Sequence, residues 1–185
     1  MSSRPRIHRT ARRHGRVPSG ETVLPILDSY LVADRLFAGE YPGASDPDVA
    51  ARRLRSFAEH GVTTFVDLTH PADGLAPYGH LLVPGARRIA HPIVDLGTTT
   101  IPRLTRILDD VDGALSGGDS VYVHCWGGVG RTGMVVGCWL VRHRLDEGDA
   151  VRAISRLRRG LPDAWAASPQ TPAQREIVST WKPGR

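Results

Sequence analysis

Short runs of apolar and β-branched residues alternate along the chain with longer segments in which apolar residues recur every three or four positions. The short runs predict strands at residues 30–32, 36–38, 62–68, 88–91 and 121–124. The longer segments predict helices over residues 45–60, 102–116, 130–144, 147–159 and 172–181. Strands that alternate with helices are typical of an α/β fold, so we predict one domain with a mostly parallel central sheet flanked by helices.

The ends of two segments carry further local signals. Ser45 is the expected N-cap of its helix, with Pro47 in the first turn and Gly61 just past the end. Four arginines after residue 150 are expected to form a solvated face: Arg152, Arg156, Arg158 and Arg159.

Charge is distributed unevenly and divides the chain. Six of the 24 basic residues are arginines within residues 1–20, which hold no acidic residue, so the rest carries 18 basic against 19 acidic residues. We therefore predict a disordered basic leader at residues 1–24, one folded domain at 25–182 and a short tail at 183–185. The leader lacks interleaved aromatic residues, so nucleic-acid binding is not predicted, although docking on an acidic partner stays an alternative.

Composition and cysteine content also indicate the cellular compartment of the protein. No run approaches the roughly 18 apolar residues that cross a bilayer, and no apolar segment follows the basic start as in a secretory signal. The two cysteines, Cys125 and Cys138, do not form a disulfide framework, and Cys138 is expected in the core. A free thiol favours a reducing compartment, so we predict a cytoplasmic protein. We also expect a monomer that needs no metal or cofactor.

The sequence between the strand at 121–124 and the following helix predicts a site for a tetrahedral oxyanion. A chain that leaves a strand, turns through glycines and enters a helix presents successive N–H groups to one point, at the positive end of the helix dipole. The groups expected to bind the anion are Trp126, Gly127, Gly128, Val129, Gly130 and Arg131, the last through a bidentate guanidinium. Cys125 lies at the floor of this loop, where the positive field favours a thiolate nucleophile.

The loop HCWGGVGRT fits the pattern H-C-x5-R-T and resembles the phosphate loop of cysteine-dependent protein tyrosine phosphatases. Three further segments match the family in order: residues 65–69, 91–95 and 168–174. The short chain and the loop sequence are most similar to the compact dual-specificity group, particularly its kinase-associated-phosphatase branch. The resemblance covers residues 31–181 and implies a protein tyrosine or dual-specificity phosphatase that forms a phosphocysteine intermediate without a metal ion.

Such a reaction needs an acid that protonates the leaving oxygen. Asp95 is the expected general acid, because it begins a segment rich in Gly and Thr that ends at Pro102, as a mobile flap should. Its spacing of 30 residues from Cys125 resembles that of compact phosphatases. Asp67 is the rival acid, but it follows an apolar strand. We therefore expect it to be a structural acceptor for the phosphate-loop backbone or His124.

Four other residues have expected supporting roles. Thr132 caps its helix, donates its hydroxyl to the sulfur of Cys125, or does both. His124 supports the loop geometry. The resemblance implies that Gln170 and Gln174 position the hydrolytic water, although Thr171 to Gln174 also has the form of a helix capping box. Trp126 and Trp165 either wall the cleft or pack in the interior.

Three functions remain open from the sequence. The first is a phosphatase for phosphotyrosine in proteins, and also for phosphoserine and phosphothreonine. The second acts on a phosphoinositide, an inositol phosphate or an RNA 5′-phosphate, but residues 126–130 contain no lysine to bind extra phosphates. The third is a catalytically idle phosphopeptide-binding module, which would need neither Cys125 nor Asp95. We therefore favour a phosphatase with a phosphoprotein substrate.

Overall fold

The computed structural model describes residues 24–143 and 147–182. Most of the predicted leader and the whole of the tail lie outside these residues. The strands are β1 (Ser29–Ala33), β2 (Leu36–Gly39), β3 (Val62–Asp67), β4 (Arg87–Ala90) and β5 (Ser120–His124). The helices are α1 (Pro47–Glu59), α2 (Ile101–Ser116), α3 (Gly130–His143), α4 (Glu147–Leu157) and α5 (Pro172–Thr180). Two single turns of 3-10 helix, η1 (Pro71–Asp73) and η2 (Gly79–Leu81), lie between β3 and β4.

The predicted fold class is confirmed. The strands form one sheet in the order β1-β2-β5-β3-β4. The pairs β2–β5, β5–β3 and β3–β4 are parallel, and β1–β2 is antiparallel. β5 is therefore the central strand, with a parallel neighbour on each side. Parallel sheets bind ligands at the carboxyl ends of their strands, which places the residue after β5 at the centre of the functional edge.

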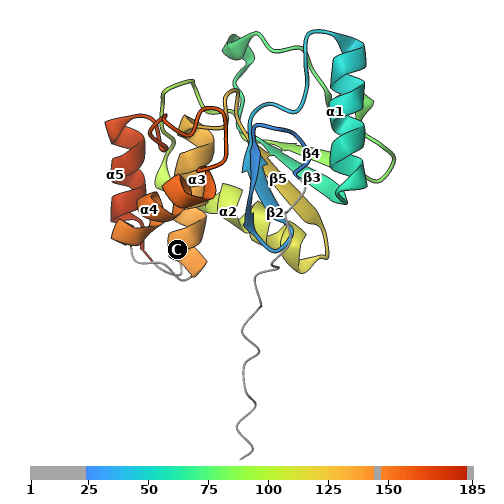
Figure 1. Ribbon diagram of the computed structural model, residues 1–185. Coiled ribbons are helices and arrows are strands. Elements are labelled where there is room, and N and C mark those ends of the chain that lie inside the picture. The colour runs from blue at the N-terminus through green and yellow to red at the C-terminus, as the bar shows by residue number, and fades with distance from the viewer. Residues whose placement is uncertain (1–23, 144–146, 183–185) are drawn as a thin grey trace, which may run out of the picture.

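Two hydrophobic cores cover the two faces of the sheet, because successive side chains of a strand point to opposite faces. On β5, Val121 and Val123 join one core, to which α2, α3, α4 and α5 contribute. Tyr122 joins the other core with Phe57 and Leu54 of α1. Figure 1 shows α1 on one side of the sheet and α3, α4 and α5 grouped on the other. The sheet thus lies between helical layers, as its apolar central strands require.

Two local predictions were wrong. The N-cap of α1 is Asp46, not Ser45, because the Asp46 carboxylate accepts hydrogen bonds from the N–H groups of Asp48 and Val49, at 2.8 and 3.2 Å. Arg158 is buried, whereas the other three arginines of the expected solvated face are exposed. The reason is that α4 ends at Leu157, and the chain then turns so that the Arg158 side chain lies beneath the phosphate loop.

Candidate active site

The phosphate loop begins where β5 ends. Cys125 follows His124 at the carboxyl edge of the sheet and is only 3% exposed. The loop then passes Gly128, whose φ is +68°, and enters α3. A Cβ atom at Gly128 would lie 2.4 Å from the carbonyl carbon of Gly39, so only glycine fits this turn. The predicted strand-loop-helix geometry is therefore present, with the thiol at its base.

The surrounding scaffold holds the loop by its carbonyl oxygens. Each of three carbonyls accepts a hydrogen bond from outside the loop: Trp126 from the Tyr41 N–H at 2.8 Å, Gly128 from Arg158 Nη1 at 2.8 Å, and Val129 from Ser168 Oγ at 2.7 Å. Within the described residues, the N–H groups of 126–129 donate no hydrogen bond. Backbone donors that are turned away from the scaffold in this way can bind an oxyanion.

Arg131 is fixed by one end of its guanidinium group. Its side chain is 1% exposed, and Nη1 donates to Asp73 Oδ2 at 2.7 Å and to the Ile93 carbonyl at 2.9 Å. Nε and Nη2 are buried and make no hydrogen bond within the described part of the chain. Nη2 nevertheless lies 2.9 Å from Asp95 Oδ1, so this contact is an ion pair without hydrogen-bond alignment. The edge of the guanidinium that suits a bidentate phosphate contact is therefore free of hydrogen bonds.

The segment that carries Asp95 forms a tight turn over the loop. The Gly97 N–H donates to the Val94 carbonyl at 2.9 Å, and Leu96 at the third position of this turn has a φ of +58°. The Asp95 side chain is 47% exposed, so it reaches both Arg131 and the solvent-facing side of the cleft. This placement suits a group that exchanges protons with a substrate.

Gln174 joins this flap to α5. Its Nε2 donates to the Gly97 carbonyl at 2.9 Å, while its Oε1 accepts from the Thr171 N–H at 3.1 Å in the expected capping box. Gln174 is fully buried. The capping interpretation is thus confirmed. The same amide also holds the flap, a contact that sequence spacing alone did not predict.

A cavity of about 240 Å³ lies above the loop. It brings together three segments that are far apart in the chain, through Asp95, through Gln170, and through the loop residues Cys125, Trp126, Gly127, Val129 and Gly130. Gln170 lies against the start of α3, since a Cβ at Gly130 would be 3.2 Å from Gln170 Oε1. Trp126 lines the cavity and is 55% exposed, whereas Trp165 is 87% exposed and does not line it.

His124 lies behind the loop in a buried network. Its Nε2 is 2.7 Å from the Tyr78 hydroxyl, and its Nδ1 is 3.3 Å from the Cys125 carbonyl. A neutral imidazole satisfies both contacts when Nδ1 donates to the carbonyl and Nε2 accepts from the hydroxyl. Burial lowers the pKa of His124 to about 4, although the nearby Asp67 charge acts in the opposite direction. His124 is therefore neutral at physiological pH and supports the residue that bears the thiol.

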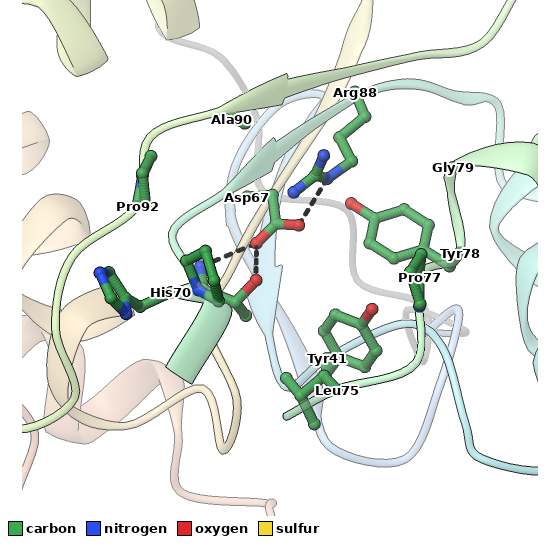
Figure 2. Close-up of a pocket in the computed structure, with 12 residues that line it drawn as sticks. Tyr41, Asp67, His70, Leu75, Pro77, Tyr78, Gly79, Arg88, Ala90 and Pro92 are labelled. Atoms are coloured by element: carbon green, nitrogen blue, oxygen red, sulfur yellow. Dashed lines mark hydrogen bonds and ion pairs between the residues drawn. The ribbon is translucent and has the colours of Figure 1, made fainter. Parts of the chain in front are cut away.

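Asp67 is a buried acceptor that does not line the catalytic cavity. Figure 2 shows it among its partners: Oδ1 accepts from the N–H and hydroxyl of Thr69 at 2.8 and 2.6 Å, and Oδ2 accepts from Arg88 Nε at 2.6 Å. Burial acts to raise its pKa, but His124, Thr69 and Arg88 outweigh this effect and lower it. Asp67 Oδ1 lies 3.9 Å from His124 Nδ1, and among the described residues the carboxylate accepts no hydrogen bond from the phosphate-loop backbone. This geometry favours the structural role over the acid.

Thr132 is placed differently from either expectation. It is a residue of the first turn of α3, which begins at Gly130, so it cannot be the residue that precedes and caps the helix. Its hydroxyl is buried and makes no hydrogen bond among the described residues, so the expected contact with the sulfur of Cys125 is not formed.

Two contributors to the site were missed from the sequence. Asp73 lies in η1, where its carboxylate also accepts from the His70 N–H at 3.1 Å, and its side chain is 4% exposed. The signal was a capping box in residues 70–73 with Pro71 at its first helical position, inside a segment predicted as loop. Arg158, which binds the Gly128 carbonyl and pairs with Asp163 at 2.7 Å, had no such signal.

The comparisons with known proteins agree with this geometry. A family model described as a polymorphic toxin system DSP-PTPase phosphatase matches residues 40–145. The chain belongs to this phosphatase family. The match includes the flap and the phosphate loop, and it confirms the resemblance to compact dual-specificity phosphatases.

A viral relative, "Putative tyrosine phosphatase 067L" of Invertebrate iridescent virus 3, is 36% identical over 119 residues. That match covers 60% of this chain and 45% of the viral protein, so the chain spans less than half of its relative. Tk-PTP in its active form is similar in structure, with a TM-score of 0.66 at 22% identity over 84% of this chain and 96% of that one.

Two further structures share the fold. Kinase-associated phosphatase with its catalytic cysteine replaced by serine has a TM-score of 0.66 at 19% identity over 85% of this chain and 94% of the other. PTPMT1 in complex with PI(5)P has a TM-score of 0.64 at 18% identity over 83% and 94%. At these identities the likeness concerns the fold. Among the described residues, no helix is long and apolar enough to cross a bilayer.

Proposed function

We propose that this chain is a protein phosphatase that hydrolyses phosphotyrosine, and also phosphoserine and phosphothreonine, through a phosphocysteine intermediate. One observation carries the proposal: Arg131 is anchored through Nη1 alone, which leaves Nε and Nη2 for two phosphate oxygens beside Cys125. The unbonded N–H groups of residues 126–129 supply further donors to the same anion. A buried guanidinium in this arrangement stabilises charge that develops on the transferred phosphoryl group.

The proposed reaction has two steps. The Cys125 thiolate attacks phosphorus, the bond from phosphorus to the substrate oxygen breaks, and Asp95 gives its proton to that oxygen. Water then attacks the phosphocysteine, Asp95 takes a proton from it, and the phosphorus–sulfur bond breaks to release phosphate and thiolate. Gln170 lines the same cavity and has an amide that can orient this water. Asp95 must leave Arg131 Nη2 when the phosphate arrives, since both compete for one cation.

A protein substrate is favoured by the charge of the cavity. Its lining holds the single carboxylate of Asp95 and no lysine, and the Arg131 guanidinium beside it is taken by the reacting phosphoryl group. The cavity therefore offers little to the extra phosphates of an inositol phosphate or an RNA 5′-triphosphate. An idle binding module is disfavoured because a thiol and a carboxyl group face the same cavity. All the proposed groups come from one chain, and both cysteines are free. We therefore infer a monomer that works in a reducing compartment, the cytoplasm.

The experiment compares wild type with Cys125→Ser on phosphotyrosyl and phosphoseryl peptides, a soluble inositol phosphate and RNA 5′-triphosphate, with a chelator present. We expect peptide turnover by wild type alone, while the serine variant still binds vanadate through the loop and Arg131. Residual turnover above about a hundredth of wild type in the serine variant would contradict nucleophilic catalysis by Cys125. Preferential turnover of inositol phosphate or RNA would replace the protein substrate with another phosphate monoester.

A further inference from the structure

Exposed large apolar side chains are concentrated in the chain segments that carry Asp95 and Trp126, two residues that line the cavity. The described residues include seven that are exposed: Leu27, Val83, Val94, Leu96, Ile101, Trp126 and Trp165. Three of them belong to residues 94–101, the segment that carries Asp95, and Trp126 lines the cavity itself. Val94 and Leu96 flank Asp95 directly, with exposures of 61% and 53%. Apolar groups that cluster beside a cavity mark a surface for a ligand or partner.

Leu96 provides a second, independent observation. It occupies the third position of the Val94–Gly97 turn with a φ of +58°, a conformation that glycine or asparagine adopts at lower cost. A leucine held in this conformation with half its surface in water gains little from packing within its own chain. The conformation of the turn therefore does not require a leucine at this position, and the exposed side chain is available for contact with another molecule.

We propose that Val94, Leu96 and Trp126, here called the apolar rim, bind bulky apolar residues that flank the phosphorylated residue of a protein substrate. This proposal rests on the proposed function and adds the class of sequence around the phosphoryl group. Asp95 and Trp126 both line the cavity, and Val94 and Leu96 are the chain neighbours of Asp95. We expect the residues on either side of the phosphorylated residue to pass over these side chains. Burying leucine-sized side chains of the substrate there releases water from apolar surface on both molecules.

A peptide fits the rim better than a membrane surface does. Phosphoinositide membranes are anionic, and proteins that bind them place clusters of lysine and arginine next to their apolar groups. Residues 94–101 and 126–130 contain no basic residue, and Asp95 adds a negative charge. Arg103 and Arg175, which follow residues 94–101 and Gln170 in the chain, donate hydrogen bonds to the carbonyls of Pro92 and Gln170 and do not form a cluster. Apolar flanking residues in a protein need no such cations.

The test uses two phosphotyrosyl peptides that differ only in their flanking residues, leucine on both sides or serine on both sides, together with 4-nitrophenyl phosphate. We expect wild type to prefer the leucine peptide by about tenfold in kcat/KM, a size that follows from partial burial of two leucines. Leu96→Asn keeps a residue that tolerates positive φ and should reduce this preference to less than about threefold. Its activity on 4-nitrophenyl phosphate should stay within about twofold of wild type, because that substrate has no flanking residues.

Leu27→Asn is the matched control, since Leu27 is an even more exposed leucine that lines a separate cavity next to β1. It should keep the full preference for the leucine peptide. Val94→Ser is a second rim variant, and it leaves Leu96 and its positive φ unchanged. It should also reduce the preference for the leucine peptide. Equal kcat/KM on both peptides in wild type, or an unchanged preference in both rim variants, would contradict binding of flanking residues by the apolar rim. Turnover of 4-nitrophenyl phosphate would still show that the proposed phosphatase activity itself is present. Faster turnover of PI(5)P in anionic vesicles than of either peptide, lost in Leu96→Asn, would overturn the protein substrate in favour of a membrane.

Discussion

Asp95 Oδ1 lies 2.9 Å from Nη2 of Arg131, so the expected general acid forms an ion pair with the same cation that a phosphate would bind. The contact compensates part of the buried guanidinium charge. A dianionic phosphoryl group brings more negative charge to the same cation and therefore displaces the carboxylate toward the leaving oxygen. We therefore expect the ion pair to couple substrate binding to the placement of the proposed acid.

Asp95→Asn tests this competition. The variant should bind vanadate several-fold more tightly than wild type, because a neutral amide no longer competes for Arg131 or repels the anion. Turnover should fall by about 10²-fold or more on phenyl phosphate and less on 4-nitrophenyl phosphate, whose leaving oxygen needs the proton least. The basic limb of the kcat/KM profile against pH should also disappear.

Asp67→Asn is the comparison for the acid. Asp67 is buried between Thr69 and Arg88, so its loss should lower the free energy of unfolding and leave the leaving-group dependence near that of wild type. If turnover depended more strongly on the leaving group in Asp67→Asn and not in Asp95→Asn, the general acid would be Asp67, at the end of β3.

Arg131 should be sensitive to shape as well as charge. Arg131→Lys keeps the cation but loses the two-pronged contact, so we expect kcat to fall more than about 100-fold, or about 2.7 kcal/mol. Steady-state kinetics on 4-nitrophenyl phosphate measure this directly. A lysine variant with nearly full activity would show that the guanidinium does not contact the phosphate.

Asp73→Asn tests the carboxylate that positions the Arg131 guanidinium. The amide cannot balance the buried charge at Nη1, so kcat/KM should fall about tenfold and the free energy of unfolding should also decrease. Asp109→Asn is a suitable control, because Asp109 is a carboxylate with 62% exposure that pairs with Arg142. Full activity in Asp73→Asn would mean that the Ile93 carbonyl alone positions the guanidinium.

Local patterns predicted the elements well, because strand alternation, helix periodicity and the glycine-rich loop are encoded within a few residues. Contacts that support the loop are not encoded in this way. Asp73 and Arg131 are 58 residues apart, and Arg158 and Gly128 are 30 apart, so only the folded sheet brings each pair together. Arg158 resembled its exposed neighbours in sequence, and its burial depended on where α4 ended.

The conformation of the segment that carries Asp95 was also only partly predictable from the sequence. The Gly- and Thr-rich composition predicted a turn after Asp95, and the turn is present. It did not indicate that Leu96 would hold the positive φ, since Gly97 follows it and is the residue that usually adopts that conformation. The capping box at Thr171 was visible, but the donation from Gln174 to Gly97 spans 77 residues.

Gln174→Glu separates the two functions of that amide. Glutamate keeps the acceptor that caps α5 but loses the Nε2 donor to the Gly97 carbonyl. We expect a larger loss of kcat on phenyl phosphate than on 4-nitrophenyl phosphate, because the flap that carries Asp95 is no longer held. The deficit relative to wild type should narrow at low pH, where a protonated carboxyl group can donate to the same carbonyl.

Thr171→Val is its matched control. The variant removes the hydroxyl that accepts from the Gln174 N–H at 3.2 Å but keeps the donor to the flap. It should cost about 1 kcal/mol of stability and leave the leaving-group ratio unchanged. Identical ratios in Gln174→Glu and Thr171→Val would show that the contact with Gly97 does not position the acid.

The last prediction concerns stability at low pH and the neutral His124. Its folded pKa of about 4 lies below the ordinary value of 6.5, so between these values the unfolded chain binds a proton that the folded chain does not. The free energy of unfolding should therefore fall as pH decreases from 6.5 through 4, by about 3 kcal/mol from this group. Glu40, whose pKa is raised chiefly by burial, acts in the opposite direction near its ordinary 4.5.

Denaturant unfolding should consequently be compared between wild type and His124→Asn, since the contribution of Glu40 cancels in the difference between their free energies of unfolding. We expect the variant to be less stable at pH 7 and to lose less stability on acidification. His80→Asn, at an exposed histidine, should follow the wild-type curve, and parallel curves for wild type and His124→Asn would show that His124 is not held neutral by the fold.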